Sequence, residues 1–498
     1  MQVFEIVIAL LLVGAILAAI ARRVATPYPA LVAIAGAAIS LFPHAPSLVL
    51  DPELVLALFV APVLLDAAFD ASQRDLRQNW RTILSLAVGA VILTVIVVAV
   101  VAHLLVPGLP WMAAIALGAI VAPPDAAAAT AVLKQLRPPN RLLVILEGES
   151  LFNDASALLI YRFALAATAT GFVSGWSFVR TLLLVGAGSI ALALVLSRIV
   201  MLFMPRIDDV ATAVIVQFCS TFAVWLVAER LHLSGILTVV IFAMLVSRTS
   251  AQTTAARIRI PSYAVWEVAV FILNVLAFIL VGLQLRQIVE RTAWTQYVGI
   301  AAAVCAAVIL ARILWVSLAA RNVVALSGRA ATIVGWCGMR GTVTLAAALA
   351  LPIHFPYRDL IFFTSFSVVL VTLVVQGITL RPLLVRLDVR DDGTVEREVQ
   401  LARVETLRAA LDAAMACGGG ENADLLRRRY ELRLRHAQRN EEDESDAEDA
   451  EVLRAATAAE RQRLIELRDD GTIGDAAFQQ VEQELDLREL DLAEIMHA

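Results

Sequence analysis

The sequence predicts an all-α polytopic membrane protein, with about thirteen transmembrane helices followed by a helical, water-soluble tail. The 498 residues are 60% hydrophobic and only 17% charged, whereas soluble domains are about 45–50% apolar. Apolar runs long enough to cross a bilayer follow one another along most of the chain. Charge is unevenly distributed as well. Residues 1–390 hold 26 basic and 17 acidic residues, and residues 391–498 hold 14 basic and 28 acidic residues.

A helix that crosses the hydrocarbon core needs about 20 apolar residues. The first run has Glu5 before it and Arg22 and Arg23 behind it, so it is interpreted as a retained helix and not as a secretory signal. In chain order, the thirteen predicted spans are 3–21, 27–43, 49–70, 81–106, 111–134, 141–169, 177–204, 209–229, 233–249, 263–289, 295–320, 329–351 and 358–382.

Basic residues between the spans support this count, because cytoplasmic loops accumulate Lys and Arg. With the N-terminus outside and thirteen crossings, eighteen basic residues fall on the inner side and five on the outer side. Omitting one span would scramble this asymmetry. We therefore expect a multi-pass protein of the cytoplasmic membrane, with its C-terminal tail in the cytoplasm.

The tail, residues 391–498, is the second predicted domain and is acidic and soluble. Residues 417–420 and the acidic run 441–449 separate its helical patches, and a run of acids is usually a solvated linker. A regulatory or dimer-reinforcing role is one hypothesis for this domain. The expected helical patches are 395–416, 422–439, 451–468 and 475–495.

The sixth span carries a polar segment, Glu147-Gly148-Glu149-Ser150-Leu151-Phe152-Asn153-Asp154. At a rise of about 1.5 Å per residue, Asp154 lies roughly 20 Å beyond Arg141, near the middle of the membrane. Ser150 and Asp154 share one helix face, and Glu149 and Asn153 share the neighbouring one. Intramembrane charges are usually paired or line an ion path. We therefore expect one face to meet an ion and the other a structural partner.

The fifth span is interrupted by Pro123 and Pro124, which remove two backbone donors and break the helix. Broken backbone at membrane depth is tolerated only against protein or a water-filled cavity. The freed carbonyls could meet a cation, with Asp125 beside them. Alternatively, Asp125 caps the second half-helix, and the two roles are compatible.

The twelfth span reads Gly335-Trp336-Cys337-Gly338-Met339-Arg340-Gly341-Thr342-Val343-Thr344 and is predicted to be a second interrupted helix. The two broken spans hold matching places in spans one to six and eight to thirteen. An inverted repeat with two discontinuous helices crossing near its midplane is a frequent transporter plan.

Three more of the charged residues inside spans have expected roles. Arg340 is a fixed charge, and its favoured role is to neutralise an acid such as Glu149. Arg312 is interpreted as another structural partner. Asp66 is either a proton relay or the partner of an arginine.

The sequence resembles the sodium/hydrogen exchanger family, specifically bacterial NhaP-type antiporters. The resemblance covers nearly the whole membrane part and includes the Pro-Val-Leu-Leu-Asp stretch at 62–66 and Gly-Met-Arg-Gly at 338–341. Its other two segments are Ala-Pro-Pro-Asp at 122–125 and Gly-Glu-Ser-Leu-Phe-Asn-Asp at 148–154. It implies an NhaA-like inverted-repeat fold and a homodimer in a bacterial inner membrane.

The resemblance also implies residue roles. Asp154 would bind Na⁺ or a proton alternately, Ser150 would lend an oxygen, and Asn153, Glu149 and Arg340 would hold the helix crossing in shape. Asn153 before Asp154 resembles electroneutral, one-for-one exchangers. Many members have Thr-Asp-Pro where this chain has Pro124-Asp125-Ala126, so the threonine ligand is missing and the choice among Na⁺, Li⁺ and K⁺ stays open.

The expected function is alternating-access exchange of a monovalent cation, Na⁺ first, for protons, with the two competing for Asp154. A K⁺/H⁺ antiporter on the same fold is the alternative. An intramembrane aspartyl-type enzyme using Asp125 and Asp154 is a remote one, since no GxGD motif accompanies them. The sequence has no Walker A motif, and we expect no cofactor beyond the transported ions and no nucleic-acid partner.

Overall fold

The computed structural model describes residues 2–24, 28–40, 42, 54, 56–133, 138–170, 175–283, 294–322, 326–389, 391, 393–416, 421–438 and short stretches between 459 and 485. All regular elements of this part of the chain are helical. The chain forms two compact units, Met1–Asp392 and Gly393–Ala498.

Helices of the first unit occupy every one of the predicted spans. Their order is α1 (Gln2–Val24), α2 (Tyr28–Ser40), η1 (Leu56–Val60), α4 (Ala61–Asp70), α5 (Gln73–Gln78), α6 (Trp80–Leu84), η2 (Ser85–Ala90), α7 (Val91–Leu105), α8 (Trp111–Val121), α9 (Ala126–Leu133), α10 (Asn140–Thr170), α11 (Gly175–Phe203), η4 (Met204–Arg206), α12 (Val210–Arg230), α13 (Gly235–Thr253), α14 (Ala256–Leu283), η5 (Trp294–Gln296), α16 (Val298–Asn322), α17 (Gly328–Trp336), α18 (Thr342–Leu349), α19 (Arg358–Val371), η6 (Thr372–Gln376) and α20 (Gly377–Leu387).

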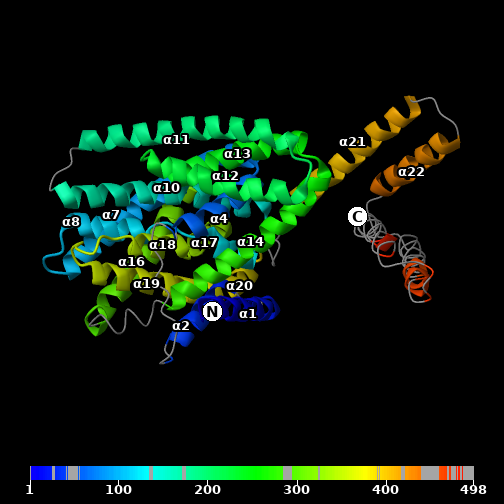
Figure 1. The fold of residues 1–498 in the computed structure, drawn as a ribbon. Helices are drawn as coiled ribbons and strands as arrows, with labels where there is room; N and C mark the ends of the chain where they lie inside the picture. The colour runs from blue at the N-terminus through cyan, green and yellow to red at the C-terminus, as the bar shows by residue number, and fades with distance from the viewer. Residues whose placement is uncertain are drawn as a thin grey trace. The chain divides into compact units, whose positions relative to one another are not determined.

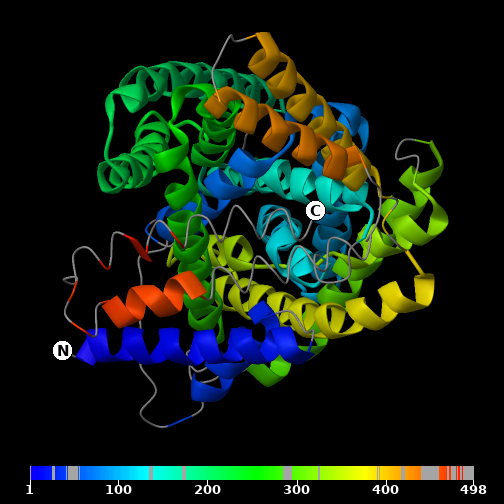
Figure 2. The same cartoon turned by 90° about the vertical axis from the view of Figure 1, so that its right-hand side faces the viewer.

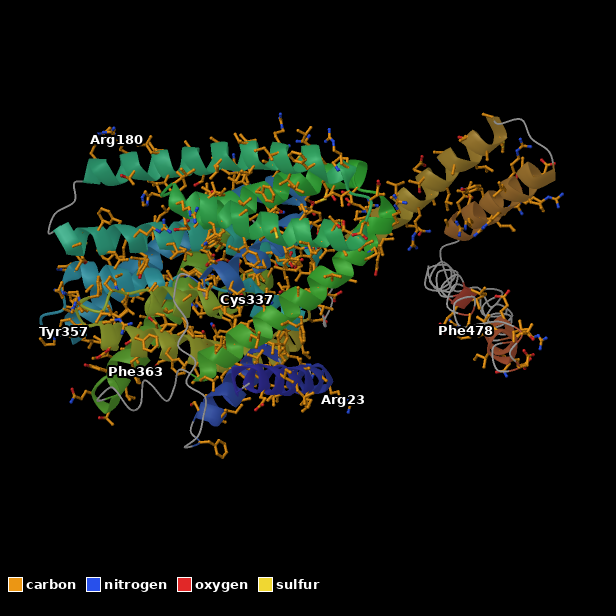
Figure 3. The ribbon with its side chains drawn as sticks, viewed as in Figure 1. Arg23, Arg180, Cys337, Tyr357, Phe363 and Phe478 are labelled. Atoms are coloured by element: carbon orange, nitrogen blue, oxygen red, sulfur yellow. The ribbon has the colours of Figure 1, made fainter. Side chains whose placement is uncertain are left out.

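Seven helical stretches within the described residues are long and apolar enough to cross a membrane. The number of crossings stays a prediction, as does the inverted repeat. Arg180 and Tyr357 lie at one end of the helical unit and Arg23 at the other (Figure 3). This separation agrees with the predicted alternation of loops between two sides, while which end faces the cytoplasm stays a prediction.

The helix of the tenth predicted span begins before the span itself. Helix α14 starts at Ala256, seven residues before the predicted 263, and contains Arg257, Arg259 and Pro261. A helix can begin in the aqueous interface and continue into the hydrocarbon, so charged residues in its first turns do not mark its start. Residues 284–289 of this span lie outside the described part.

The two interrupted helices lie in the interior of the unit. Figure 1 places α17 and α18 between α10 on one side and α16 and α19 on the other, whereas Figure 2 shows α1 along one edge. Both predicted breaks are present: α8 ends at Val121 and α9 begins at Ala126, and α17 ends at Trp336 and α18 begins at Thr342. The functional groups of the polar spans are therefore brought to the centre of the helical unit.

Helices α2 and α14 pack with their backbones almost touching. A Cβ atom at Gly36 would lie 2.5 Å from the carbonyl oxygen of Ile279, and one at Gly282 would overlap the backbone of α2. Small residues permit this close approach. In lipid, where the hydrophobic effect does not drive helices together, the van der Waals packing of such close contacts stabilises their association. The contact holds α14 against α2 and so positions the side chains that α14 directs inward.

In the second unit, α21 (Thr394–Ala416) and α22 (Glu421–Gln438) form a helical pair. The guanidinium of Arg427 donates to the carbonyl oxygen of Ala414 at 3.0 Å, and Gln400 donates to that of Ala437. These helices match the first two predicted patches. Much of the other two patches falls outside the described residues.

Candidate functional site

The two broken helices meet through their backbones. The N–H of Asp125 donates to the carbonyl oxygen of Met339 at 2.7 Å. Pro123 and Pro124 lack donors, so the segment between α8 and α9 cannot remain helical. The contact ties one break to the other and satisfies a donor that would otherwise be buried without a partner.

Arg340 occupies the carbonyls that the first break releases. Its guanidinium donates to the carbonyl oxygens of Val121 at 3.0 Å and Ala122 at 3.4 Å, and also to that of Gly338. The backbone N–H of Arg340 donates to the hydroxyl of Thr372 at 3.0 Å. Arg340 was expected to neutralise Glu149, but among the described residues it forms no direct ion pair with that acid. Its guanidinium donors bind carbonyl oxygens at the two breaks instead.

The partner of Glu149 is Arg312, from α16. The two side chains form a two-pronged ion pair with nitrogen–oxygen distances of 2.5 and 2.9 Å, and both are almost completely buried. Arg312 also donates to the carbonyl oxygen of Val334 at 3.1 and 3.2 Å, near the end of α17. The pair therefore links α10, α16 and the second broken helix, which explains one of the two polar faces of α10.

The other polar face of α10 borders a small cavity of about 40 Å³. About 10–15 Å³ of such space holds one water molecule, so the cavity has room for a monovalent ion with few or no waters. Among the described residues, Asp125 and Asp154 are the charged members of its lining. The described lining residues are Phe59, Val60, Val63, Leu64, Pro123, Pro124, Asp125, Ala127, Ser150, Asp154, Asn274, Gly341, Thr342, Val343 and Thr344.

Asp125 is held in place by backbone donors from both broken helices. Its carboxylate accepts from the N–H of Ala127 at 2.9 Å and from the N–H of Thr342. It therefore lies at the N-termini of α9 and α18, where the helix dipoles favour a negative charge. Asp125 therefore caps α9, as expected, and also lines the cavity.

Asp154 has a different environment. It is 6% exposed, and within the described residues its carboxylate has no hydrogen-bond or ion-pair partner. It is near enough to Asp125 for the two charges to repel each other. A buried carboxylate without a partner is costly as an anion, so Asp154 is the group in this cavity that most needs a bound cation or proton.

Of the remaining predicted residues, some line the cavity and the others lie outside its lining. Ser150 lines the cavity and accepts from the N–H of Ala126 at 3.4 Å. Asn153 does not line it; its amide donates to the carbonyl oxygen of Pro124 at 3.0 Å. Asp66 lies on α4 outside the lining. The carbonyl oxygens of Val121 and Ala122 accept from Arg340 and that of Pro124 from Asn153. Pro124 also lines the cavity, so its contact with a cation stays a prediction.

Three polar lining residues were missed by the sequence reasoning. Thr342 and Thr344 lie in the quoted Gly-rich segment, and the buried hydroxyl of Thr344 has no partner among the described residues. Asn274 comes from α14 and is hydrogen-bonded to Tyr28 of α2. A lone amide in an otherwise apolar span was the available signal, because polar groups are expensive there unless they are used.

Gly341 offers a direct test of this geometry. A Cβ atom at this position would overlap the carboxylate of Asp125, so Gly341→Ala must displace that carboxylate. We expect exchange activity in liposomes to fall about tenfold or more, as a loss of one well-placed charged contact implies. The matched control is Gly299→Ala, where no atom lies within 4 Å of the new Cβ. Equal activity of the two variants would contradict the assigned role of Asp125.

A helical membrane protein with a small cavity that is lined by carboxylates where two broken helices cross has the architecture of a secondary cation transporter. The chain belongs to the sodium/hydrogen exchanger family: the family model "Sodium/hydrogen exchanger, transmembrane" matches residues 7–386. The protein is therefore a transporter and not an enzyme, and its family carries out cation/proton antiport.

Individual relatives agree with this assignment. An uncharacterized Na⁺/H⁺ exchanger of Mycobacterium tuberculosis is 30% identical over 98% of this chain and 96% of its own. The sodium, potassium, lithium and rubidium/H⁺ antiporter of Bacillus pumilus is 31% identical over 83% of this chain and 66% of its own. The sodium proton antiporter MjNhaP1 of Methanocaldococcus jannaschii has the same fold, with a TM-score of 0.62 and 18% identity over 76% of this chain and 99% of its own.

Proposed function

We propose that this protein exchanges Na⁺ for H⁺ by alternating access, with the cation and the proton competing for Asp154. The observation that carries the proposal is the contrast between the two cavity carboxylates. Asp125 is held by the N–H groups of Ala127 and Thr342, whereas Asp154 has no partner in the described part of the chain. One carboxylate is thus held in place by the backbone, and the other is free to exchange its ligand.

The electrostatics of the cavity favour an occupied Asp154. Two negative charges in a water-poor site repel each other, and a cation placed between them removes most of this cost. Carboxylate, hydroxyl and amide oxygens are suitable ligands for a hard cation. Asp154, Asp125, Ser150 and Asn274 bring such oxygens to the same 40 Å³ cavity. A proton on Asp154 also removes the repulsion, so proton and cation are alternatives.

The different roles of Asp125 and Asp154 imply electroneutral exchange. If the charge of Asp125 does not change and only Asp154 changes its ligand, one Na⁺ is exchanged for one proton in each complete transport cycle. Asn153 adds no second titratable acid beside Asp154, and its amide is bonded to the carbonyl oxygen of Pro124. We propose the same one-for-one stoichiometry for K⁺, the alternative substrate, because the Bacillus pumilus relative is a sodium, potassium, lithium and rubidium/H⁺ antiporter.

The cellular setting is part of the proposal. The excess of basic residues on one set of loops supports a bacterial cytoplasmic membrane, with the N-terminus outside and the residues 391–498 in the cytoplasm. We also propose a homodimer, in line with the resemblance to NhaP-type antiporters. Asp66 stays a proposed relay, and Arg312, Glu149 and Arg340 are proposed to keep the helix crossing in shape.

The test is transport by the full chain in liposomes with an imposed proton gradient and a pH-sensitive dye inside. Na⁺, Li⁺ and K⁺ are added in turn. We expect Na⁺ to dissipate the gradient, and a clamped membrane potential to leave the rate unchanged. Dissipation by K⁺ alone would establish the alternative, and no response to any of the three cations would refute the transport function.

Competition at one carboxylate predicts a specific pH dependence. Because a cation ligand must be deprotonated, the KM for Na⁺ should rise as the pH falls, by up to about tenfold per pH unit, while the maximal rate changes little. Asp125 also lines the cavity, and its carboxylate accepts from the N–H of Ala127. The measurement is the initial rate against Na⁺ concentration at several pH values. A KM independent of pH would contradict competition.

A further inference from the structure

A second cavity lies away from the ion site, between α5, α6, α10 and α13. Its volume is about 320 Å³, at the lower end of the roughly 300–1,000 Å³ typical of ligand pockets. Most of its wall is apolar, with Arg77 and Gln73 as its polar members. The lining consists of Gln73, Leu76, Arg77, Trp80, Ile83, Leu84, Phe152 and Met244.

The mouth of this cavity continues a stripe of exposed apolar side chains. Trp80 is 54% and Leu84 52% exposed, and both line the cavity. Exposed apolar residues continue along α7 at intervals of four, an arrangement that places them on one helix face. The continuation of the stripe is Ile92, Ile96, Val100 and Leu104. In a membrane protein such a face contacts acyl chains, so the cavity opens toward lipid and not only toward water.

The rim of the cavity carries positive charge next to the start of the candidate membrane span that begins at Trp80. Arg77 lines the cavity and is exposed, and it has no ion-pair partner among the described residues. The guanidinium of Arg81 lies over the ring of Trp80, 5.6 Å from its centroid. The acids of this stretch, Asp70 and Asp75, do not line the cavity. Tryptophan and arginine together are typical of the headgroup region.

We propose that this cavity binds one phospholipid with an anionic headgroup. An acyl chain occupies the apolar wall between Leu84, Phe152 and Met244, and the phosphate meets the guanidinium of Arg77. Basic pockets between transmembrane helices on the cytoplasmic side are suited to anionic headgroups. A water-filled entry path is disfavoured by the apolar wall, and a zwitterionic lipid gains less from the unpaired arginine.

The site also touches the ion-binding helix. Phe152 lies on α10 two residues before Asp154, and Met244 belongs to α13. A bound chain therefore packs against both helices at once. The inference is independent of which cation is transported, because it concerns binding at the lipid-facing surface.

The test is quenching of Trp80 fluorescence by brominated acyl chains in vesicles of phosphatidylcholine and phosphatidylglycerol. The bromine is placed on one lipid or the other at equal total content. The protein has eight tryptophans, so the contribution of Trp80 is the difference between the full chain and its Trp80→Phe variant. We expect this contribution to be quenched at least about twice as strongly by brominated phosphatidylglycerol, since a charge-assisted contact enriches the anionic lipid.

Arg77→Gln should abolish that preference, and Arg77→Lys should retain part of it. The matched control is Arg180→Gln, an exposed arginine at the end of the unit opposite Arg23 (Figure 3). Normal Na⁺/H⁺ exchange by each variant shows that it is folded. The proposal is overturned by equal quenching from both lipids, by the absence of Trp80-dependent quenching, or by a preference that survives Arg77→Gln.

Discussion

Asp154→Asn is expected to abolish exchange. The amide has nearly the shape of the carboxylate but can neither hold a cation by charge nor release a proton. A charge pair at about 4 Å and an effective dielectric constant of 20 is worth on the order of 4 kcal/mol, which corresponds to roughly a 100- to 1,000-fold loss. The cavity offers no replacement, because its other carboxylate, Asp125, is held by backbone donors.

The measurement is the initial rate of dissipation of the proton gradient in liposomes that contain equal amounts of folded protein. The control is Asp208→Asn, which removes the charge of a highly exposed aspartate paired with Arg257 at 3.2 Å. This control should retain the wild-type rate. A wild-type exchange rate in Asp154→Asn would refute the proposed site, whichever cation is transported.

Of the variants described, Arg312→Leu is expected to lower the free energy of unfolding the most. It leaves the carboxylate of Glu149, which is 1% exposed, buried without its two-pronged partner. Breaking a buried ion pair from one side costs about 3–5 kcal/mol. The lost donors to the carbonyl oxygen of Val334 add to this cost. Thermal unfolding of the purified protein in detergent, followed by circular dichroism, should show a clearly lowered Tm.

The double variant Glu149→Leu/Arg312→Leu should recover much of that Tm, because no uncompensated charge remains. Arg257→Leu is the matched surface control: its partner Asp208 is mostly exposed, and exposed ion pairs contribute little. If Arg312→Leu unfolds at the wild-type temperature, the assignment of Glu149 to Arg312 as a structural pair is wrong.

The two arginines of the helix crossing have different tasks that no single-residue pattern distinguishes. Both are almost completely buried. Arg312 neutralises a carboxylate, whereas Arg340 binds carbonyl oxygens at the first break. Each helix break thus requires donors from another element, since lipid provides none. This requirement explains why positive charge is kept at the centre of a cation transporter.

The candidate site was partly accessible from sequence. Asp154, Asp125, Ser150 and Pro124 line the cavity, and their spacing around a proline break was enough to locate them. The place of Asn274 in the site could not be predicted from the sequence, because a single amide in an apolar run does not reveal what its helix packs against. Its place in the cavity depends on the close approach of α14 to α2.

The sequence by itself determined the helical spans, both helix breaks and the polar faces of α10. These features follow from local rules: lipid demands about 20 apolar residues per crossing, and adjacent prolines cannot donate hydrogen bonds. Only the tertiary structure decided that Glu149 pairs with Arg312, 163 positions away, and that Arg340 binds the carbonyls of the first break. Partner choice among buried charges depends on which helices pack together, and that information is not local in the chain.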